Sequence, residues 1–144
     1  MSNPKYDFQV MWGDMDANAH LANTGYLDYA SQCRMLYLGE GGFGHKEALK
    51  LGVGSVALHD NISYRKELHM LEKFSVDFQC GGINSKKSRY IFVNRFYGED
   101  GELRAEVRSM IVWMDLKLRK STIPPQFIID RLEALPRTED YQEL

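Results

Sequence analysis

The chain has 144 residues, of which 44% are hydrophobic and 26% are charged, and its net charge is -2 at pH 7. These values are typical of one ordinary folded domain and exclude a disordered or fibrous protein, and the slight negative charge argues against broad affinity for nucleic acid. Because no apolar run approaches the roughly 20 residues of a membrane-spanning helix and residues 1–10 lack an apolar signal core, we expect a single domain over residues 1–144, in the cytoplasm and without membrane partners.

Hydrophobic periodicity predicts a strand followed by one long helix in the first part of the chain. Residues 6–12 alternate loosely and are rich in aromatic side chains, as in a strand. Small and apolar residues then recur at steps of three and four, and these are Tyr26, Ala30, Cys33 and Tyr37. This spacing predicts the buried face of a helix over residues 25–38, with Thr24 as its N-cap. The polar residues of that helix that we expect to face water are Asp28, Gln32 and Arg34.

After a short helical turn at residues 45–51, the pattern changes to the two-residue period of strands. The further strands are expected at residues 56–65, 74–80, 90–97 and 103–118. The first of them should be half-buried, and the two cysteines, Cys33 and Cys80, should be buried free thiols. Pro124 and Pro125 open a last amphipathic segment, residues 127–135, with proline at its first helical turn. This order favours an α+β fold in which a curled antiparallel sheet of about five strands wraps around one long central helix.

Polar residues are densest in the loop between the first strand and the helix. They occupy every second position, at Asp14, Asp16, Asn18 and His20. They directly precede a helix N-terminus, whose free N–H groups attract negative charge. A structural interpretation is that they form turns and caps. A calcium loop would share the first three ligand positions, but Ala19 stands where glycine is required and Gly25 where a glutamate is needed, so we expect no metal.

A catalytic interpretation comes from a resemblance. The string WGDMDANAHLAN, followed by Tyr26, resembles the signature of the hotdog-fold acyl thioesterases, both the 4-hydroxybenzoyl-CoA thioesterase-like group and the plant acyl-ACP enzymes. The matching positions are Trp12, Asp14, Asp16, Asn18, His20, Asn23 and Tyr26. Ala22 replaces an asparagine of the pattern. Residues 62–68 resemble a second segment, with Glu67 in place of proline. The plant enzymes are double hotdogs, whereas this chain has the length of a single one. Their further catalytic acid has no match here.

The resemblance implies hydrolysis of an acyl-CoA or acyl-carrier-protein thioester, without a cofactor beyond the coenzyme A of the substrate. Asp16 would act as nucleophile or general base, with Asn18 holding the carboxylate or the water and His20 orienting groups or moving a proton. Backbone N–H groups around Asn23 and Tyr26 would bind the oxyanion. Asp14 is expected to order the turn. The histidines outside the motif should be packing or surface residues, and they are His45, His59 and His69.

The anionic carrier end of such a substrate would need basic side chains. The candidates are Arg65, Lys66, Lys86, Lys87 and Arg89, although such runs are also found on ordinary solvated faces. Hotdog relatives cover an exposed sheet edge by pairing, which predicts a homodimer or homotetramer with its site between subunits. Two other functions stay open: a hotdog dehydratase or hydratase, and a non-catalytic acyl-CoA binding protein. The acyl group itself is not specified by the sequence.

Overall fold

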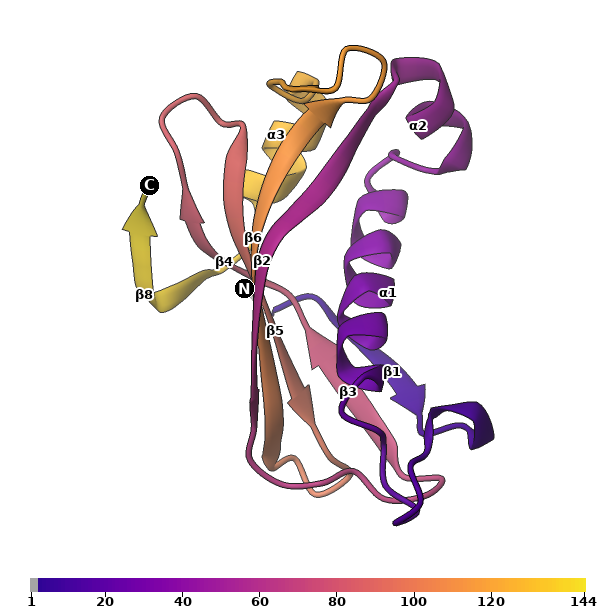
Figure 1. Cartoon of the computed structure of the whole chain (residues 1–144). Coiled ribbons are helices and arrows are strands. Elements are labelled where there is room, and N and C mark those ends of the chain that lie inside the picture. Colours follow the sequence, from indigo (N-terminus) through magenta and orange to yellow (C-terminus); the bar gives the residue numbers. More distant parts are fainter. Residues whose placement is uncertain (1–2) are drawn as a thin grey trace.

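The computed structural model describes residues 3–144 as a curled, eight-stranded sheet with helices packed against it (Figure 1). The helical elements are η1 (Trp12–Asp14), α1 (Gly25–Glu40), α2 (His45–Leu51) and α3 (Gln126–Glu133). The strands are β1 (Lys5–Gln9), β2 (Val53–Tyr64), β3 (Lys73–Asp77), β4 (Gln79–Ile83), β5 (Arg89–Tyr97), β6 (Leu103–Asp115), β7 (Lys120–Ser121) and β8 (Arg137–Glu143). No helix among these residues is long and apolar enough to cross a membrane.

The sheet runs from β2 through β6 to β5, and β3 and β4 both pair with the other side of β5. β1 then pairs with β3, and β8 pairs with β4. Every pairing is antiparallel except that of β4 with β8. β2 pairs with β6 alone, so its outer side is an open edge of the sheet among the described residues.

The predicted face of α1 is confirmed. Its small and apolar residues Tyr26, Ala30, Cys33 and Tyr37 are all buried. They pack against aromatic side chains of the sheet, and Tyr26 lies 5.2 Å from Phe96 between ring centroids. Burying one such side chain contributes roughly 1.5–3 kcal/mol, so this contact fixes α1 across the curled sheet. The two cysteines are buried free thiols, as expected.

The architecture is richer than the sequence pattern indicated. Residues 3–144 contain three α-helices where one long helix was expected, although α1 is 16 residues long and α2 and α3 cover two segments expected to be short or amphipathic helices. Eight strands replace the five expected. The expected third strand is divided at Phe78, whose backbone N–H donates to Pro4 O at 3.0 Å instead of continuing the ladder.

Two predictions about burial are wrong. Arg34 was expected to face water, but only 9% of it is exposed, because its side chain turns under α1 toward the sheet. β2 was expected to be half-buried, yet most of its residues are exposed. A bulge at Leu58 shifts the register with β6, so the two-residue pattern does not stay on one face. An edge strand also lacks a neighbour that could cover its outer side.

Candidate active site

The polar loop before α1 is held against the segment that follows β2. The backbone N–H of Leu21 donates to Leu68 O at 2.8 Å, and that of Met70 donates to Ala19 O at 2.9 Å. Ala19 has a φ of 59°, a left-handed conformation that is costly for a residue with a side chain. The hydrogen bonds of its neighbours fix this tight turn. The backbone of the loop therefore follows a defined path.

Asp14 fastens the loop to α1. Its Oδ2 accepts a hydrogen bond from the Tyr29 hydroxyl and another from the backbone N–H of Met11, at 3.4 Å in the second case. Burial, followed by this bond to Asp14, raises the pKa of Tyr29. Both observations fit the expectation that Asp14 orders the turn.

Asp16 lies two positions further on and has one committed and one free carboxylate oxygen. Oδ1 accepts the backbone N–H of Asn18 at 2.8 Å and that of His20 at 3.2 Å. Oδ2 has no hydrogen-bond donor among residues 3–144. The carboxylate is thus held by one oxygen and exposes the other. The Asn18 side chain makes no hydrogen bond within the described chain, so the contact to Asp16 comes from its backbone and not from its amide group.

Asp16 lines a small cavity of about 250 Å³ at the N-terminal end of α1. We call this cavity the Asp16 pocket. Its lining residues are Asp16, His20, Leu21, Asn23, Tyr26, Tyr64, Arg65, Lys66 and Glu67. The pocket therefore gathers most of the residues predicted from the motif, together with the two basic residues after β2. Asn18 is not among the lining residues.

Tyr64 and Glu67 are two lining residues that the sequence analysis did not predict for the site. The Tyr64 hydroxyl donates to Asn23 O at 3.0 Å, and its ring meets Tyr26 edge to face at 5.3 Å. Burial raises the pKa of Tyr26. The signal for both missed residues was present, because they belong to the second segment of the resemblance, residues 62–68. That segment was compared with the family pattern, but Tyr64 and Glu67 were assigned no role in the site.

His20 faces His69 across a short bridge between the loop and residues 67–72. Their ring centroids are 5.2 Å apart in an edge-on arrangement, so His69 packs against the His20 ring. A hydrogen bond from its own backbone N–H lowers the pKa of Glu67, and the neighbouring His20 and His69 also favour its charged form. The pocket therefore contains two carboxylates, those of Asp16 and Glu67.

Arg104 on β6 supports this wall of the pocket from behind. Its Nη1 donates to Glu67 O at 2.7 Å, and its Nη2 lies 3.0 Å from Glu72 Oε2. Its own carbonyl accepts the backbone N–H of Arg65 at 2.8 Å. Arg104 is buried, and its paired carboxylates offset the cost of burying its charge. The position of residues 65–72 thus depends on the sheet beneath them.

The start of α1 is a plain helix N-terminus. Thr24 occupies the cap position, but its side chain makes no capping hydrogen bond. A Cβ added to Gly25 would lie 2.7 Å from Leu21 Cδ1, so glycine lets the loop pass close to the helix. The N–H groups of the first turn are consequently not occupied by the side chain that usually caps them.

The other basic candidates lie elsewhere. Lys86 and Lys87 belong to the turn between β4 and β5, and Arg89 begins β5. Figure 1 shows this turn at the opposite end of the sheet from the loop before α1. Lys87 is also paired with Glu133, at 3.0 Å between Nζ and Oε1. One chain therefore does not bring these three residues to Asp16.

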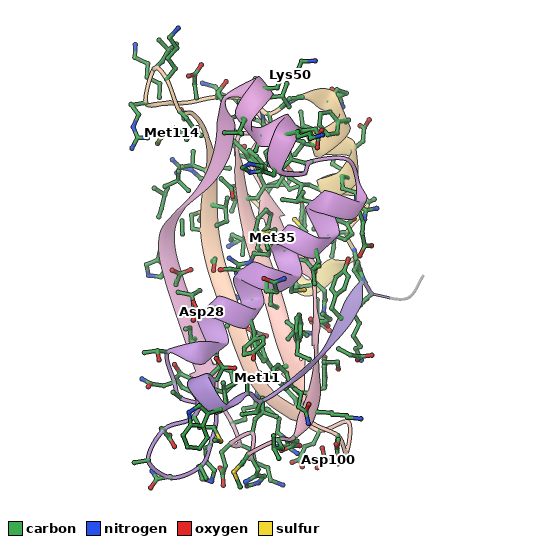
Figure 2. All side chains as sticks on the ribbon, turned by 90° about the vertical axis from the view of Figure 1, so that its right-hand side faces the viewer. Met11, Asp28, Met35, Lys50, Asp100 and Met114 are labelled. Atoms are coloured by element: carbon green, nitrogen blue, oxygen red, sulfur yellow. The ribbon has the colours of Figure 1, made fainter. Side chains whose placement is uncertain are left out.

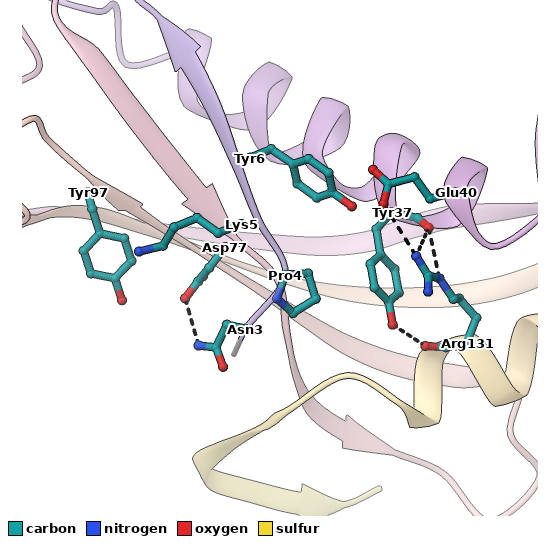
Figure 3. A pocket seen from close by; sticks show the side chains of 9 residues that line it. All are labelled: Asn3, Pro4, Lys5, Tyr6, Tyr37, Glu40, Asp77, Tyr97 and Arg131. Atoms are coloured by element: carbon teal, nitrogen blue, oxygen red, sulfur yellow. Dashed lines mark hydrogen bonds and ion pairs between the residues drawn. The ribbon is translucent and has the colours of Figure 1, made fainter. Parts of the chain in front are cut away.

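A second cavity, of about 760 Å³, lies between β1, α1 and α3 (Figure 3). Asp77 at its base accepts the backbone N–H of Arg95 at 2.8 Å, and burial raises the pKa of its carboxyl group. Arg131 donates to Tyr37 O at 3.0 Å and stacks on the Tyr37 ring. Of the two carboxylates in its lining, that of Asp77 is engaged by hydrogen bonds, and that of Glu40 lies 3.9 Å from Arg131.

A third cavity, of about 470 Å³, lies between α1, α2 and the start of β2, and we call it the Arg34 pocket. Its lining residues are Ser31, Arg34, Met35, Leu38, Gly39, Phe43, Gly44, His45, Ala48, Ser55, Ala57, Phe92 and Ile111. Figure 2 shows Met35 about halfway along α1, on the side that faces the viewer. Most of this lining is apolar, in contrast to the Asp16 pocket.

Exposed apolar side chains surround the loop that bears Asp16. Trp12 is 87% exposed and Met11 is 57% exposed. Met70 and Leu71, on the segment that pairs with the loop, are exposed by 53% and 60%. Apolar side chains concentrated beside a polar site typically mark a surface that meets another molecule.

The sequence profile of the thioesterase-like superfamily matches residues 10–132, while no curated protein matches the chain. A hypothetical protein from Staphylococcus aureus, solved in complex with CoA, has a TM-score of 0.84 at 19% identity, over 92% of this chain and 82% of that one. A 1,4-dihydroxy-2-naphthoyl-CoA thioesterase from Synechocystis has a TM-score of 0.82 at 17% identity, with 93% and 98% covered. A gentisyl-coenzyme A thioesterase gives 0.76 at 18% identity, with 86% and 98% covered.

These structural similarities, at such low identity, establish the curled-sheet fold alone. The profile match goes further, because it covers the Asp16 loop, α1 and the strands β2 to β6. The solved structures that resemble this chain are hotdog-fold proteins. The chain therefore belongs to the thioesterase-like superfamily.

Proposed function

We propose that this protein hydrolyses the thioester of an acyl-CoA or an acyl carrier protein, with Asp16 as nucleophile or general base. The observation that carries the proposal is the state of the Asp16 carboxylate. One oxygen is fixed by two backbone N–H groups, the other accepts no hydrogen bond within residues 3–144, and the residue lines a pocket at the N-terminal end of α1. A reactive group fixed on one side and open on the other suits attack on a bound carbonyl.

Two reaction courses fit this geometry. As a general base, Asp16 takes a proton from water, and the oxygen of that water bonds to the acyl carbon. As a nucleophile, the carboxylate itself bonds to the acyl carbon and forms an anhydride, which water then cleaves. In both courses the carbon–sulfur bond breaks, and the thiolate leaves and takes up a proton. The oxyanion formed on the way lies against backbone N–H groups around Asn23 and Tyr26, at the positive end of α1, whereas the N–H of Gly25 is already donated to Ala22 O at 2.8 Å.

His20 and the basic residues have supporting roles in this proposal. The His20 ring lines the pocket, where it can orient groups or move a proton during the reaction. Arg65 and Lys66 line the same pocket and carry positive charge toward the phosphates of the carrier. Lys66 is already 3.2 Å from Glu102, in an exposed pair, so a phosphate would compete with that carboxylate.

We further propose that the working unit is at least a homodimer joined along β2. Antiparallel pairing of two β2 strands about a two-fold axis lays the end of one strand beside the start of the other. Tyr64, at the end of β2, lines the Asp16 pocket, and Ser55 and Ala57, near its start, line the Arg34 pocket. The Asp16 pocket of one copy would then meet the Arg34 pocket of the other, which completes a site that is shallow and open in one chain.

The test is thiol release from purified protein, measured with short, medium, long and aryl acyl-CoAs and with acyl carrier protein thioesters. We expect Asp16→Asn to lower kcat/KM by at least about 100-fold, because the neutral amide can neither accept a proton nor attack. Asp28→Asn is the matched control, since it makes the same change on an exposed residue in the first turn of α1. It should stay within about twofold of wild type.

The outcomes separate the possible functions. If wild type releases no thiol from any thioester, the hydrolase proposal is wrong, and tight binding of acyl-CoA without turnover would indicate a binding protein. Hydration of crotonyl-CoA in the absence of thiol release would indicate a hydratase. Equal rates for wild type and Asp16→Asn would remove Asp16 from the chemistry. Incorporation of ¹⁸O from labelled water into the Asp16 carboxyl group would identify the nucleophilic course.

A further inference from the structure

Arg34 is a buried cation without a carboxylate. It is 9% exposed, and within residues 3–144 it forms no ion pair. Arg104 on β6, the other buried arginine among residues 3–144, lies 3.0 Å from Glu72 and 3.1 Å from Asp100. Buried charges are normally paired, because desolvation costs several kcal/mol for each ion. Arg34 is therefore an exception to this rule, because no carboxylate in residues 3–144 pairs with its charge.

The partners that Arg34 does have are neutral. Its Nε donates to Asn94 Oδ1 and its Nη2 donates to Ser109 Oγ, both at 2.8 Å. The nearest negative charge along this chain of bonds is Asp60, which accepts from the Ser109 hydroxyl and not from Arg34. Burial lowers the pKa of Arg34 to about 10, and Asp60 offsets only part of that effect.

The third guanidinium nitrogen is unused. No acceptor for Arg34 Nη1 occurs among the described residues, and the side chain lines the Arg34 pocket. The other polar groups of that lining are a rim imidazole, from the exposed His45, and the hydroxyls of two exposed serines. Leu38, Phe43 and Ile111 supply apolar walls. The cavity thus combines one desolvated cation with an apolar enclosure.

From this geometry we propose that the Arg34 pocket binds a small carboxylate with an apolar body, the carboxylate against Arg34 and the body against the apolar walls. A carboxylate matches a guanidinium in charge and in planar shape, and such pairs are the strong class of hydrogen bond. The cavity, of about 470 Å³, has the size of an ordinary small-molecule site. Such a carboxylate could come from two sources. One is a free carboxylic acid, and the other is an acyl group whose far end is a carboxylate.

The binding statement rests on the pocket alone, whereas its extension to acyl groups rests on the proposed function. In the proposed dimer, the Arg34 pocket of one copy faces the Asp16 pocket of the other. A thioester at Asp16 would then extend its acyl chain toward Arg34. Dicarboxylic acyl thioesters would be preferred over those that end in a methyl group, because only they neutralise the buried cation.

The first experiment is calorimetric binding of hexanoate, with 1-hexanol as the neutral probe of equal length. We expect wild type and Asp16→Asn to bind hexanoate at least tenfold more tightly than hexanol. Ala48→Trp, which fills the cavity from α2, should weaken hexanoate binding at least tenfold. Leu49→Trp is the matched control, because it adds the same side chain at the next position, which is 72% exposed and outside the lining.

Arg34→Met should abolish the preference for hexanoate over hexanol. That change also leaves Asn94 and Ser109 without their donor, so the two tryptophan variants decide the matter if it does not fold. Equal affinity of wild type for the two probes overturns the proposal. Hexanoate binding that survives Ala48→Trp overturns it as well, because the ligand would then lie elsewhere.

The second experiment compares kcat/KM for adipoyl-CoA and hexanoyl-CoA. We expect wild type to prefer adipoyl-CoA at least tenfold, and this preference should be lost in Ala48→Trp and kept in Leu49→Trp. That result would identify the carboxylate end of an acyl group as the ligand of the Arg34 pocket. If hexanoyl-CoA is the better substrate while free hexanoate still binds, the pocket is a site for the free acid. If hexanoate binds but no thioester is hydrolysed, the pocket stands and the hydrolase proposal fails.

Discussion

Two aspartates of one short loop have different tasks because their hydrogen bonds differ. Asp14 is engaged by a tyrosine hydroxyl and a backbone N–H, and it holds the loop against α1. Asp16 uses one oxygen to brace its own turn and leaves the other free. Their spacing alone does not distinguish them, and the resemblance was what led us to expect chemistry at Asp16 and a turn at Asp14. Their hydrogen-bond partners distinguish them: the Tyr29 side chain for Asp14, and the backbone N–H groups of Asn18 and His20 for Asp16.

Glu72 permits a test of how firmly the wall of the Asp16 pocket is held. Burial tends to raise the pKa of Glu72, but hydrogen bonds from the backbone N–H groups of His69 and Glu99 and from Arg104 outweigh it and lower the pKa below its ordinary value of 4.5. The folded protein thus binds this proton less tightly than the unfolded chain, so the ionised group stabilises the fold above that pH and loses this effect as the pH falls.

We expect Glu72→Gln to lower the free energy of unfolding at neutral pH by about 2 kcal/mol, because Arg104 loses its buried partner. The difference from wild type should shrink as the pH falls below 4.5, where wild type also loses the charge. Urea unfolding at pH 7 and at about pH 3 measures both values. A difference that stays constant over this range would show that the ionised form of Glu72 does not stabilise the fold.

Single residues were predicted from the sequence where their roles are local. The motif residues Asp16, His20, Asn23 and Tyr26 do meet in one pocket, since a short loop and the helix after it can only be close together. Arg34 could not be predicted in the same way. Its burial depends on Asn94 and Ser109, which lie on strands far along the chain and supply acceptors that no helical pattern reveals.

At the scale of elements, the junction between the loop and α1 depends on one glycine. A Cβ on Gly25 would meet Leu21 Cδ1 at 2.7 Å, and Leu21 is buried. We expect Gly25→Ala to lower the stability by about 1–3 kcal/mol through overpacking and to lower thiol release by displacing the loop. Thermal or urea unfolding, together with the thiol-release assay, measures the two effects.

Gly39, near the end of the same helix, is the matched control. A Cβ there would meet nothing within 4 Å. Gly39→Ala should therefore raise the stability by about 0.5–1 kcal/mol, because alanine favours the helix and adds no clash. If both alanine variants change the stability in the same direction, the close approach at Gly25 does not restrict the loop.

The elements themselves were predicted best where a pattern was long and local. α2 lies where the short helical turn was expected, and the face of α1 is confirmed. The division of one expected strand at Phe78 and the pairing of β8 with β4 were missed, because both depend on neighbours distant in the sequence. β2 was misjudged for a similar reason, since alternation cannot show that a strand is at the edge of a sheet.

For the whole molecule, the open side of β2 is the feature that should govern assembly. Leu58, the bulged residue in the middle of this strand, is 54% exposed. A two-fold pairing of β2 would bring the Leu58 side chains of two copies close together. We expect Leu58→Asp to weaken dimerisation at least 100-fold, because two like charges would meet there, and to reduce thiol release with it.

Analytical ultracentrifugation over a range of concentrations measures this dissociation. Leu144→Asp is the control, as it makes the same change next to β8, on the opposite edge of the sheet, where the residue is 38% exposed. It should leave the assembly unchanged. A wild-type protein that is monomeric at all concentrations and still releases thiol would show that one chain forms a complete site.

The two tryptophans of the chain differ in a way that makes the protein its own optical probe. Trp113 is fully buried, whereas Trp12 beside the Asp16 loop is 87% exposed. A small aqueous quencher of fluorescence should therefore extinguish the emission of Trp12 and spare that of Trp113. A ligand or a second copy that covers the loop will shield the Trp12 indole and shift its emission to shorter wavelength. Binding at this surface can therefore be followed in real time without a label.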